Sequence, residues 1–229
     1  MLLASRVWHA VLLAAVVAAV VLELVVLFGG GADPNSGRTS AGLSVMGKLV
    51  RLISFFTIDS NILVGATSVL LIMNPVRDGR LWRILRMDAL LSIAITGLVF
   101  AVILAPKVHL HGVALAATIL LHYIVPPAAV VGWVLFGPWG QMDRRTVLWA
   151  FVWPALWIGY TLAHGAVTDW YPYPFLEVFR LGYAVVARNT VLVLVVAVAV
   201  ALLLMWVDGL LVSRQARSSA RPDREDARQ

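Results

Sequence analysis

The stretch VWHAVLLAAVVAAVVLELVVLF, residues 7–28, decides the class of fold. A run of about 20 mostly apolar residues is long enough for an α-helix to cross the hydrocarbon core of a bilayer. A cleaved signal peptide is the competing interpretation, but this run exceeds a usual signal core, and the GGGADP that follows is a poor cleavage site. We therefore expect a retained membrane span.

The composition of the whole chain extends this interpretation. Of the 229 residues, 61% are hydrophobic and only 13% are charged, and the mean hydropathy is +0.90. A soluble domain is closer to half apolar and a quarter charged. The chain contains no Cys, which excludes disulfides, thiolate catalysis and Cys-ligated metals. Since it also carries no nucleotide-binding or soluble catalytic motif, we predict a polytopic membrane protein.

The apolar runs predict an all-α fold of six transmembrane helices. Clusters of Gly, Pro, Asn and Asp separate the runs, as loops require. We place the spans at approximately 7–28, 47–73, 84–105, 113–136, 146–166 and 185–212.

The distribution of Arg predicts the orientation of the bundle. With six spans, most Arg residues fall on one side, and positive residues in short loops mark the cytoplasmic face. Both termini should then be cytoplasmic, and the net charge of +6 reflects topology rather than nucleic-acid binding. We divide the chain into a transmembrane domain, 1–213, and an Arg-rich tail, 214–229, which we expect to be disordered. Asp88 and Asp208 lie near the cytoplasmic ends, where pairing with Arg is expected.

Polar residues interrupt the second predicted helix at FFTIDSN, residues 55–61. Thr57 and Asn61 share a helical face because they are four residues apart, whereas Asp59 points elsewhere on a regular helix. Hydroxyl groups in membrane helices often bond only to their own backbone. An ionisable residue below the interface, such as Asp59, is a functional-site candidate.

The fourth predicted helix contains TILLHYIVPP, residues 118–127. Pro126 and Pro127 lack backbone donors, so we expect a kink next to His122. At about 1.5 Å of rise per residue, His122 and Thr57 both lie roughly 15 Å below the outer ends of their helices. The two side chains can therefore face each other, although a buried His is often only a hydrogen-bonded core residue.

A neutral imidazole next to a hydroxyl can accept its proton and activate the oxygen as a nucleophile. This hypothesis makes Thr57 the nucleophile and His122 the general base of an ester-cleaving site. Asn61 is then a candidate donor to the developing oxyanion. Asp59 could orient His122 only if the helix is locally distorted.

On FFTIDSN, on LLHYIVP (residues 120–126) and on the span count, the chain resembles the androgen-induced protein and androgen-dependent TFPI-regulating protein family. The resemblance implies an intramembrane threonine hydrolase of fatty acid esters of hydroxy fatty acids, with Thr57 as nucleophile, His122 as base and no cofactor. YPYPFLEV, residues 171–178, looks like a feature of bacterial relatives. The implied setting is a bacterial plasma membrane, with membrane lipids and a lipid ester as partners.

The fifth and sixth predicted helices carry candidate substrate-binding residues. Trp157, Tyr160 and His164 lie near one broad face, which either packs and forms an interfacial belt or lines an acyl-chain tunnel. Arg188 could receive a lipid carboxylate, although snorkelling to the interface is the more common role of such an Arg.

Two other functions remain open from the sequence. A metal site could draw on His109, His111, His122 and His164, since three imidazoles can hold zinc, although about 16 Å of helix separates His111 from His122. A transporter or non-catalytic scaffold would use the polar cluster as a pocket or as contacts between helices. The hydrolase hypothesis predicts Thr57 and His122 within about 4 Å and an elongated apolar cavity beside them, whereas a scaffold predicts a filled core.

Overall fold

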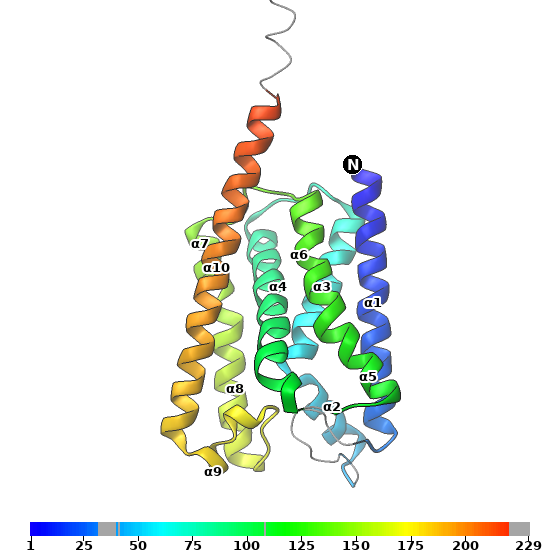
Figure 1. Ribbon diagram of the computed structural model, residues 1–229, viewed down its shortest axis with the longest axis vertical. Helices are drawn as coiled ribbons and strands as arrows, with labels where there is room; N and C mark the ends of the chain where they lie inside the picture. Colours follow the sequence, from blue (N-terminus) through cyan, green and yellow to red (C-terminus); the bar gives the residue numbers. More distant parts are fainter. Residues whose placement is uncertain (32–39, 41, 108, 220–229) are drawn as a thin grey trace, which may run out of the picture.

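The computed structural model of the protein describes residues 1–31, 40, 42–107 and 109–219. Over these residues the chain is 84% helical and contains no strand. Six of the described helices are long and apolar enough to cross a membrane, and they run side by side in one bundle (Figure 1). The predicted all-α six-helix fold is confirmed, and the protein is a multi-pass membrane protein.

The six spans differ in regularity. Three are single unbroken α-helices, and the other three contain a short π-helical turn or a break. The elements are α1 (Leu2–Phe28), α2 (Val45–Ile53), α3 (Phe56–Met73), α4 (Arg80–Val99), η1 (Phe100–Leu104), η2 (Ala105–Lys107), α5 (Gly112–Ile119), η3 (Leu120–Ile124), α6 (Val125–Phe136), α7 (Arg144–Ala150), α8 (Val152–Thr168), η4 (Pro174–Leu176), α9 (Val178–Leu181) and α10 (Tyr183–Ser219).

Helix α4 occupies the middle of the bundle and packs against α3, α6, α7 and α10. It is the most buried of the six spans, and its Met87, Leu90 and Leu91 form the centre of the largest apolar core cluster. On the other side, α1 packs against α3, α5 and α6. The outer faces of the spans expose Val and Leu side chains, as lipid-facing surfaces require.

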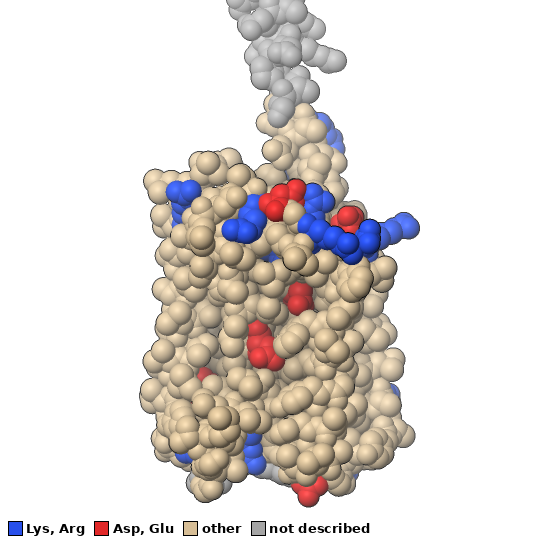
Figure 2. All heavy atoms as spheres, turned by 180° about the vertical axis from the view of Figure 1, so that it is seen from behind, with Lys and Arg blue, Asp and Glu red and all other residues tan. Residues whose placement is uncertain are grey.

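The start of α1 and the end of α10 lie at the same end of the bundle (Figure 1). Lys and Arg side chains gather along that end, above a broad belt with few charges (Figure 2). Within this charged rim Arg83 donates to both carboxylate oxygens of Asp78, at 2.6 and 2.7 Å. That contact, together with the backbone N–H of Gly79, lowers the pKa of Asp78 to about 2. The start of α1 and the end of α10 thus lie at the charged end of the bundle, and the orientation in the membrane stays a prediction.

The prediction of one continuous helix over 47–73 is wrong, because the helix breaks at Ser54 and Phe55. Phe55 is extended, with φ −79° and ψ 120°. The carbonyl of Ser54 accepts a hydrogen bond from the indole of Trp157 at 3.2 Å, and its hydroxyl contacts the hydroxyl of Tyr160 at 2.7 Å. These bonds to α8 replace the helical ladder, so a new helix, α3, begins inside the bundle, immediately before Thr57.

The first residues of the predicted Arg-rich tail are helical rather than disordered. Helix α10 continues through Ser219 and projects beyond the ends of the other helices (Figure 1). The remaining part of the predicted tail, 220–229, lies outside the described residues.

Neither Asp88 nor Asp208 forms the expected ion pair with Arg within the described part of the chain. Asp88 instead accepts a hydrogen bond from Ser92 at 3.0 Å. Asp208 accepts from the backbone N–H groups of Gly140 and Met142, at 3.0 and 3.1 Å. The carboxylate of Asp208 thus ties the α6–α7 loop to α10.

Replacing Asp208 with Ala is expected to lower the free energy of unfolding by about 2–4 kcal/mol, since two partly buried N–H groups lose their acceptor. Ser213→Ala, on the same helix, is the control, because its exposed hydroxyl bonds only to the Gly209 carbonyl and should matter little. Denaturation in detergent micelles measures both variants. Equal midpoints for the two would contradict this role of Asp208.

Candidate active site

Thr57 and His122 meet where α3 begins and η3 turns. Thr57 is the second residue of α3, and His122 lies at the centre of the π-helical turn Leu120–Ile124. Thr57 Oγ1 and His122 Nε2 are 3.3 Å apart, and both side chains are buried, at 6% exposure each. The predicted proximity of the two residues is therefore confirmed.

The hydrogen bond made by His122 Nδ1 determines whether Nε2 can accept a proton. His122 Nδ1 lies 3.1 Å from the carbonyl oxygen of Thr118, one turn earlier. A carbonyl only accepts, so Nδ1 carries the proton and Nε2 presents a lone pair to Thr57. The imidazole is thus held in the tautomer that a general base needs.

The imidazole ring is also fixed by its neighbours. The ring of Phe100 stacks on it, with centroids 3.8 Å apart and planes 24° from parallel. Phe100 opens the π-helical turn at the end of α4, so two irregular turns face each other at this point. The expected distortion near Pro126 and Pro127 takes the form of the turn that contains His122, because prolines cannot donate to the helical ladder.

A third polar side chain reaches Thr57 from the α8–α10 connection, residues 169–182. The backbone N–H of Thr57 donates to the hydroxyl oxygen of Tyr173 at 3.2 Å, and the two hydroxyl oxygens are 3.1 Å apart. The break before α3 explains the first contact, since the second N–H of a helix has no partner within the helix.

The hydrogen bonds of Tyr173, Thr57 and His122 can all be assigned one donor and one acceptor without conflict. Tyr173, which accepts from the Thr57 N–H, can donate its own proton to Thr57 Oγ1. Thr57 then donates to His122 Nε2, and His122 Nδ1–H donates to the Thr118 carbonyl. The hydroxyl proton of Thr57 is therefore directed at the one atom of the site that can remove it.

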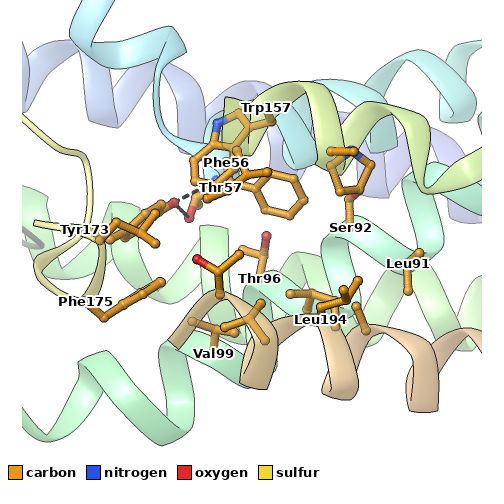
Figure 3. Close-up of a pocket in the computed structure, with 18 of the residues that line it drawn as sticks. Phe56, Thr57, Leu91, Ser92, Thr96, Val99, Trp157, Tyr173, Phe175 and Leu194 are labelled. Carbon is orange, nitrogen blue, oxygen red and sulfur yellow. Dashed lines mark hydrogen bonds between the residues drawn. The ribbon is translucent and has the colours of Figure 1, made fainter. Parts of the chain in front are cut away.

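A cavity of about 280 Å³ opens beside Thr57. Figure 3 shows Thr57 and Tyr173 at one end, with Thr96, Ser92 and Leu194 further along. Its walls come from α3, α4, η1, α8, η4 and α10 and are almost entirely apolar. Such a cavity accommodates a hydrocarbon chain, with Thr57 and Tyr173 at one end.

The supporting residues predicted beside Thr57 have other roles. The amide nitrogen of Asn61 donates to the carbonyl oxygens of Thr57 and Leu121, at 2.8 and 3.4 Å, and Asn61 does not line the cavity. It ties α3 to η3 and has no free donor directed at a substrate. Asp59 makes no hydrogen bond with His122; it lies in the first turn of α3, where a carboxylate complements the helix dipole.

Of the four residues predicted to bind substrate, one lines the cavity and three do not. Trp157 lines the cavity. The other three are absent from its lining: Tyr160 bonds to Ser54, the ring of His164 stacks on Tyr160 with centroids 5.4 Å apart, and exposed Arg188 contacts Asn189 at 3.4 Å.

No group of three or more His, Asp or Glu side chains suited to a metal ion occurs within the described ranges. The His-based metal site is therefore not assembled there. His109 and His111 lie in the segment before α5, whereas His122 lies in η3 and His164 in α8.

Sequence reasoning missed Tyr173 as a site residue, as well as the cavity wall from α10, Val193, Leu194 and Ala197. Aliphatic residues of a membrane helix carry no signal that separates a cavity wall from a lipid-facing surface. Tyr173 does lie within the YPYPFLEV stretch, where two prolines hold an aromatic segment extended. Comparison with known protein families, with curated proteins and with solved structures found no match to this chain.

Proposed function

We propose that the protein is an intramembrane hydrolase of fatty acyl esters, in which Thr57 is the nucleophile and His122 the general base. One observation carries the proposal: Thr57 Oγ1 lies 3.3 Å from His122 Nε2 at one end of an apolar cavity. A hydroxyl next to a tautomerically fixed imidazole is the arrangement that activates an alcohol for attack on an ester.

The reaction proceeds in two balanced steps. Thr57 Oγ1 bonds to the ester carbon while its proton passes to His122 Nε2, and the carbonyl π electrons move to the carbonyl oxygen. Collapse of this intermediate breaks the bond to the leaving alcohol, which takes the proton from His122 and leaves an acyl-Thr57 ester. Water, activated in turn by His122, cleaves that ester and regenerates both side chains.

The cavity supports a lipid substrate. An acyl chain gains roughly 0.8 kcal/mol for each methylene removed from water, and the walls around Thr57 present few polar groups that would select a polar chain. In this proposal the chain is a bacterial plasma-membrane relative of the androgen-induced protein family, with cytoplasmic termini. The ester would enter from the outer leaflet, since α3, whose second residue is Thr57, begins toward the end of the bundle opposite the termini (Figure 1).

Labelling with a fluorophosphonate tests the proposal, because this probe bonds covalently to activated hydroxyl groups. Purified wild-type protein is expected to be labelled on Thr57, located by mass spectrometry of the modified peptide. Thr57→Val removes the hydroxyl but keeps the side-chain shape, so labelling should be lost completely. Thr67→Val is the matched control on α3, since Thr67 is also buried but bonds to the Leu63 and Val64 carbonyls.

Labelling of Thr57→Val at the wild-type rate would overturn the assignment of the nucleophile. Failure of the wild type to react, with the protein folded and monodisperse, would reject the hydrolase. That result would favour the alternative, a carrier of small lipophilic molecules, which the apolar cavity also suits.

A further inference from the structure

We infer that Tyr173 is a further catalytic residue, whose phenolic hydroxyl donates the hydrogen bond that stabilises the oxyanion formed on the ester carbonyl. The inference rests on the proposed hydrolase function. It assigns the site a third functional group, delivered by the α8–α10 connection rather than by either helix of the Thr–His pair.

Ester cleavage through a tetrahedral intermediate needs a donor directed at the carbonyl oxygen. The hydroxyl and indole groups of the other polar side chains around the cavity already donate to acceptors within the protein. Thr96 donates to Ser60 at 3.1 Å, and Thr190 donates to the Val186 carbonyl at 2.9 Å. Ser92 and Trp157 are likewise bonded, to Asp88 and to the Ser54 carbonyl. Of the donors that line the cavity, the Tyr173 hydroxyl is the one in contact with Thr57.

The position of the Tyr173 hydroxyl fits this role. Its oxygen is 3.1 Å from Thr57 Oγ1, the atom that bonds to the ester carbon. The oxyanion forms on that same carbon and therefore lies next to Oγ1. A small rotation of the phenolic O–H transfers its hydrogen bond from Oγ1 to the oxyanion. Thr57 is also the second residue of α3, so the positive end of the helix dipole faces the developing charge.

The tyrosine ring is held rigidly, as an effective oxyanion donor must be. It is 5% exposed and stacks on Phe175, with centroids 5.4 Å apart. The rings of Phe55 and Trp157 flank it at 5.8 and 6.0 Å. Asn189 on α10 anchors the segment by donating to the Phe175 carbonyl at 2.9 Å.

In the chemical step Tyr173 donates a hydrogen bond without losing its proton. The proton of Thr57 goes to His122 and then to the leaving alcohol, and the oxyanion returns its electron pair to the carbonyl on collapse. Because Tyr173 stabilises charge that exists only in the intermediate and its flanking transition states, its removal should lower kcat without changing KM.

The first test compares Tyr173→Phe with Tyr171→Phe. Both replace a buried tyrosine of the α8–α10 connection by the same chemical change, but only Tyr173 contacts Thr57. With a p-nitrophenyl ester of a fatty acid, kcat of Tyr173→Phe is expected to fall about 10²- to 10³-fold, as when one oxyanion donor is removed. Its KM should stay at the wild-type value, and Tyr171→Phe should retain wild-type kcat. The thermal midpoint of Tyr173→Phe should fall modestly, because the buried Thr57 N–H loses its acceptor.

A second test separates donation from packing. Incorporation of 3-fluorotyrosine at position 173 lowers the pKa of the phenol while preserving its shape and contacts. A phenolate cannot donate, so the alkaline limb of the pH–kcat profile should move to lower pH; a purely structural tyrosine would leave the profile unchanged. This variant also decides the question should Tyr173→Phe fail to fold.

The outcomes distinguish this inference from the hydrolase proposal. Labelling of Thr57 together with wild-type kcat in Tyr173→Phe, or an unmoved profile in the fluorotyrosine variant, would overturn the inference and leave the Thr–His hydrolase standing. A wild-type protein that neither reacts with the fluorophosphonate nor cleaves the ester would overturn both.

Discussion

Replacing His122 with Asn is expected to slow ester hydrolysis by about 10²- to 10⁴-fold, the usual contribution of a general base. The asparagine amide nitrogen takes the place of Nδ1 and can keep the bond to the Thr118 carbonyl, which in the native protein is 3.1 Å long. What the substitution removes is Nε2, the atom 3.3 Å from the Thr57 hydroxyl. The loss should therefore appear in kcat, measured with a fatty acid p-nitrophenyl ester.

His164→Asn is the matched control for this prediction. His164 is a histidine of the same bundle that lies outside the cavity, beside Tyr160 and Thr168, and its replacement should leave kcat unchanged. A rate for His122→Asn equal to that of His164→Asn would remove His122 from the reaction. It would also leave the 3.3 Å contact as packing between two buried polar groups.

The fold was predictable because the signal for a membrane span is long and simple. Runs of about 20 apolar residues between Gly- and Pro-rich breaks fix the number of spans, and six are present among the described helices. The pairing of Thr57 with His122 was predictable for a similar reason. Distance along a helix converts directly into depth, and polar residues buried in a membrane helix face the bundle interior.

The details of the site escaped prediction because they depend on contacts between distant segments. The break at Ser54 arises from bonds to Trp157 and Tyr160, more than 100 residues later. Regular helical periodicity consequently placed Asn61 beside the nucleophile as a donor, whereas its amide is bonded to backbone carbonyls. Tyr173 lies in the connection between α8 and α10, where no helical periodicity predicts the position of a side chain.

Gly165→Ala is expected to destabilise the protein by about 1–3 kcal/mol, the usual cost of overpacking a core, and to lower the rate of hydrolysis. Glycine to alanine within a helix ordinarily stabilises, by about 0.5–1 kcal/mol. Here a Cβ on Gly165 would overlap the ring of Tyr171, which packs in the same cluster as Tyr173. Either the ring or the connection must move, and the clash outweighs the gain in helix propensity.

Gly159→Ala separates the effect of the clash with Tyr171 from the effect of helix propensity. Gly159 lies six residues earlier on α8, and a Cβ there meets nothing within 4 Å. That variant should be as stable as the wild type or slightly more so, with unchanged kcat. If Gly165→Ala unfolded at the same temperature as Gly159→Ala and hydrolysed ester at the same rate, the α8–α10 connection would not be tightly seated on α8. The position of the Tyr173 hydroxyl against Thr57 depends on that seating, so a fall in kcat confined to Gly165→Ala would link the packing of Tyr171 to the chemistry at Thr57.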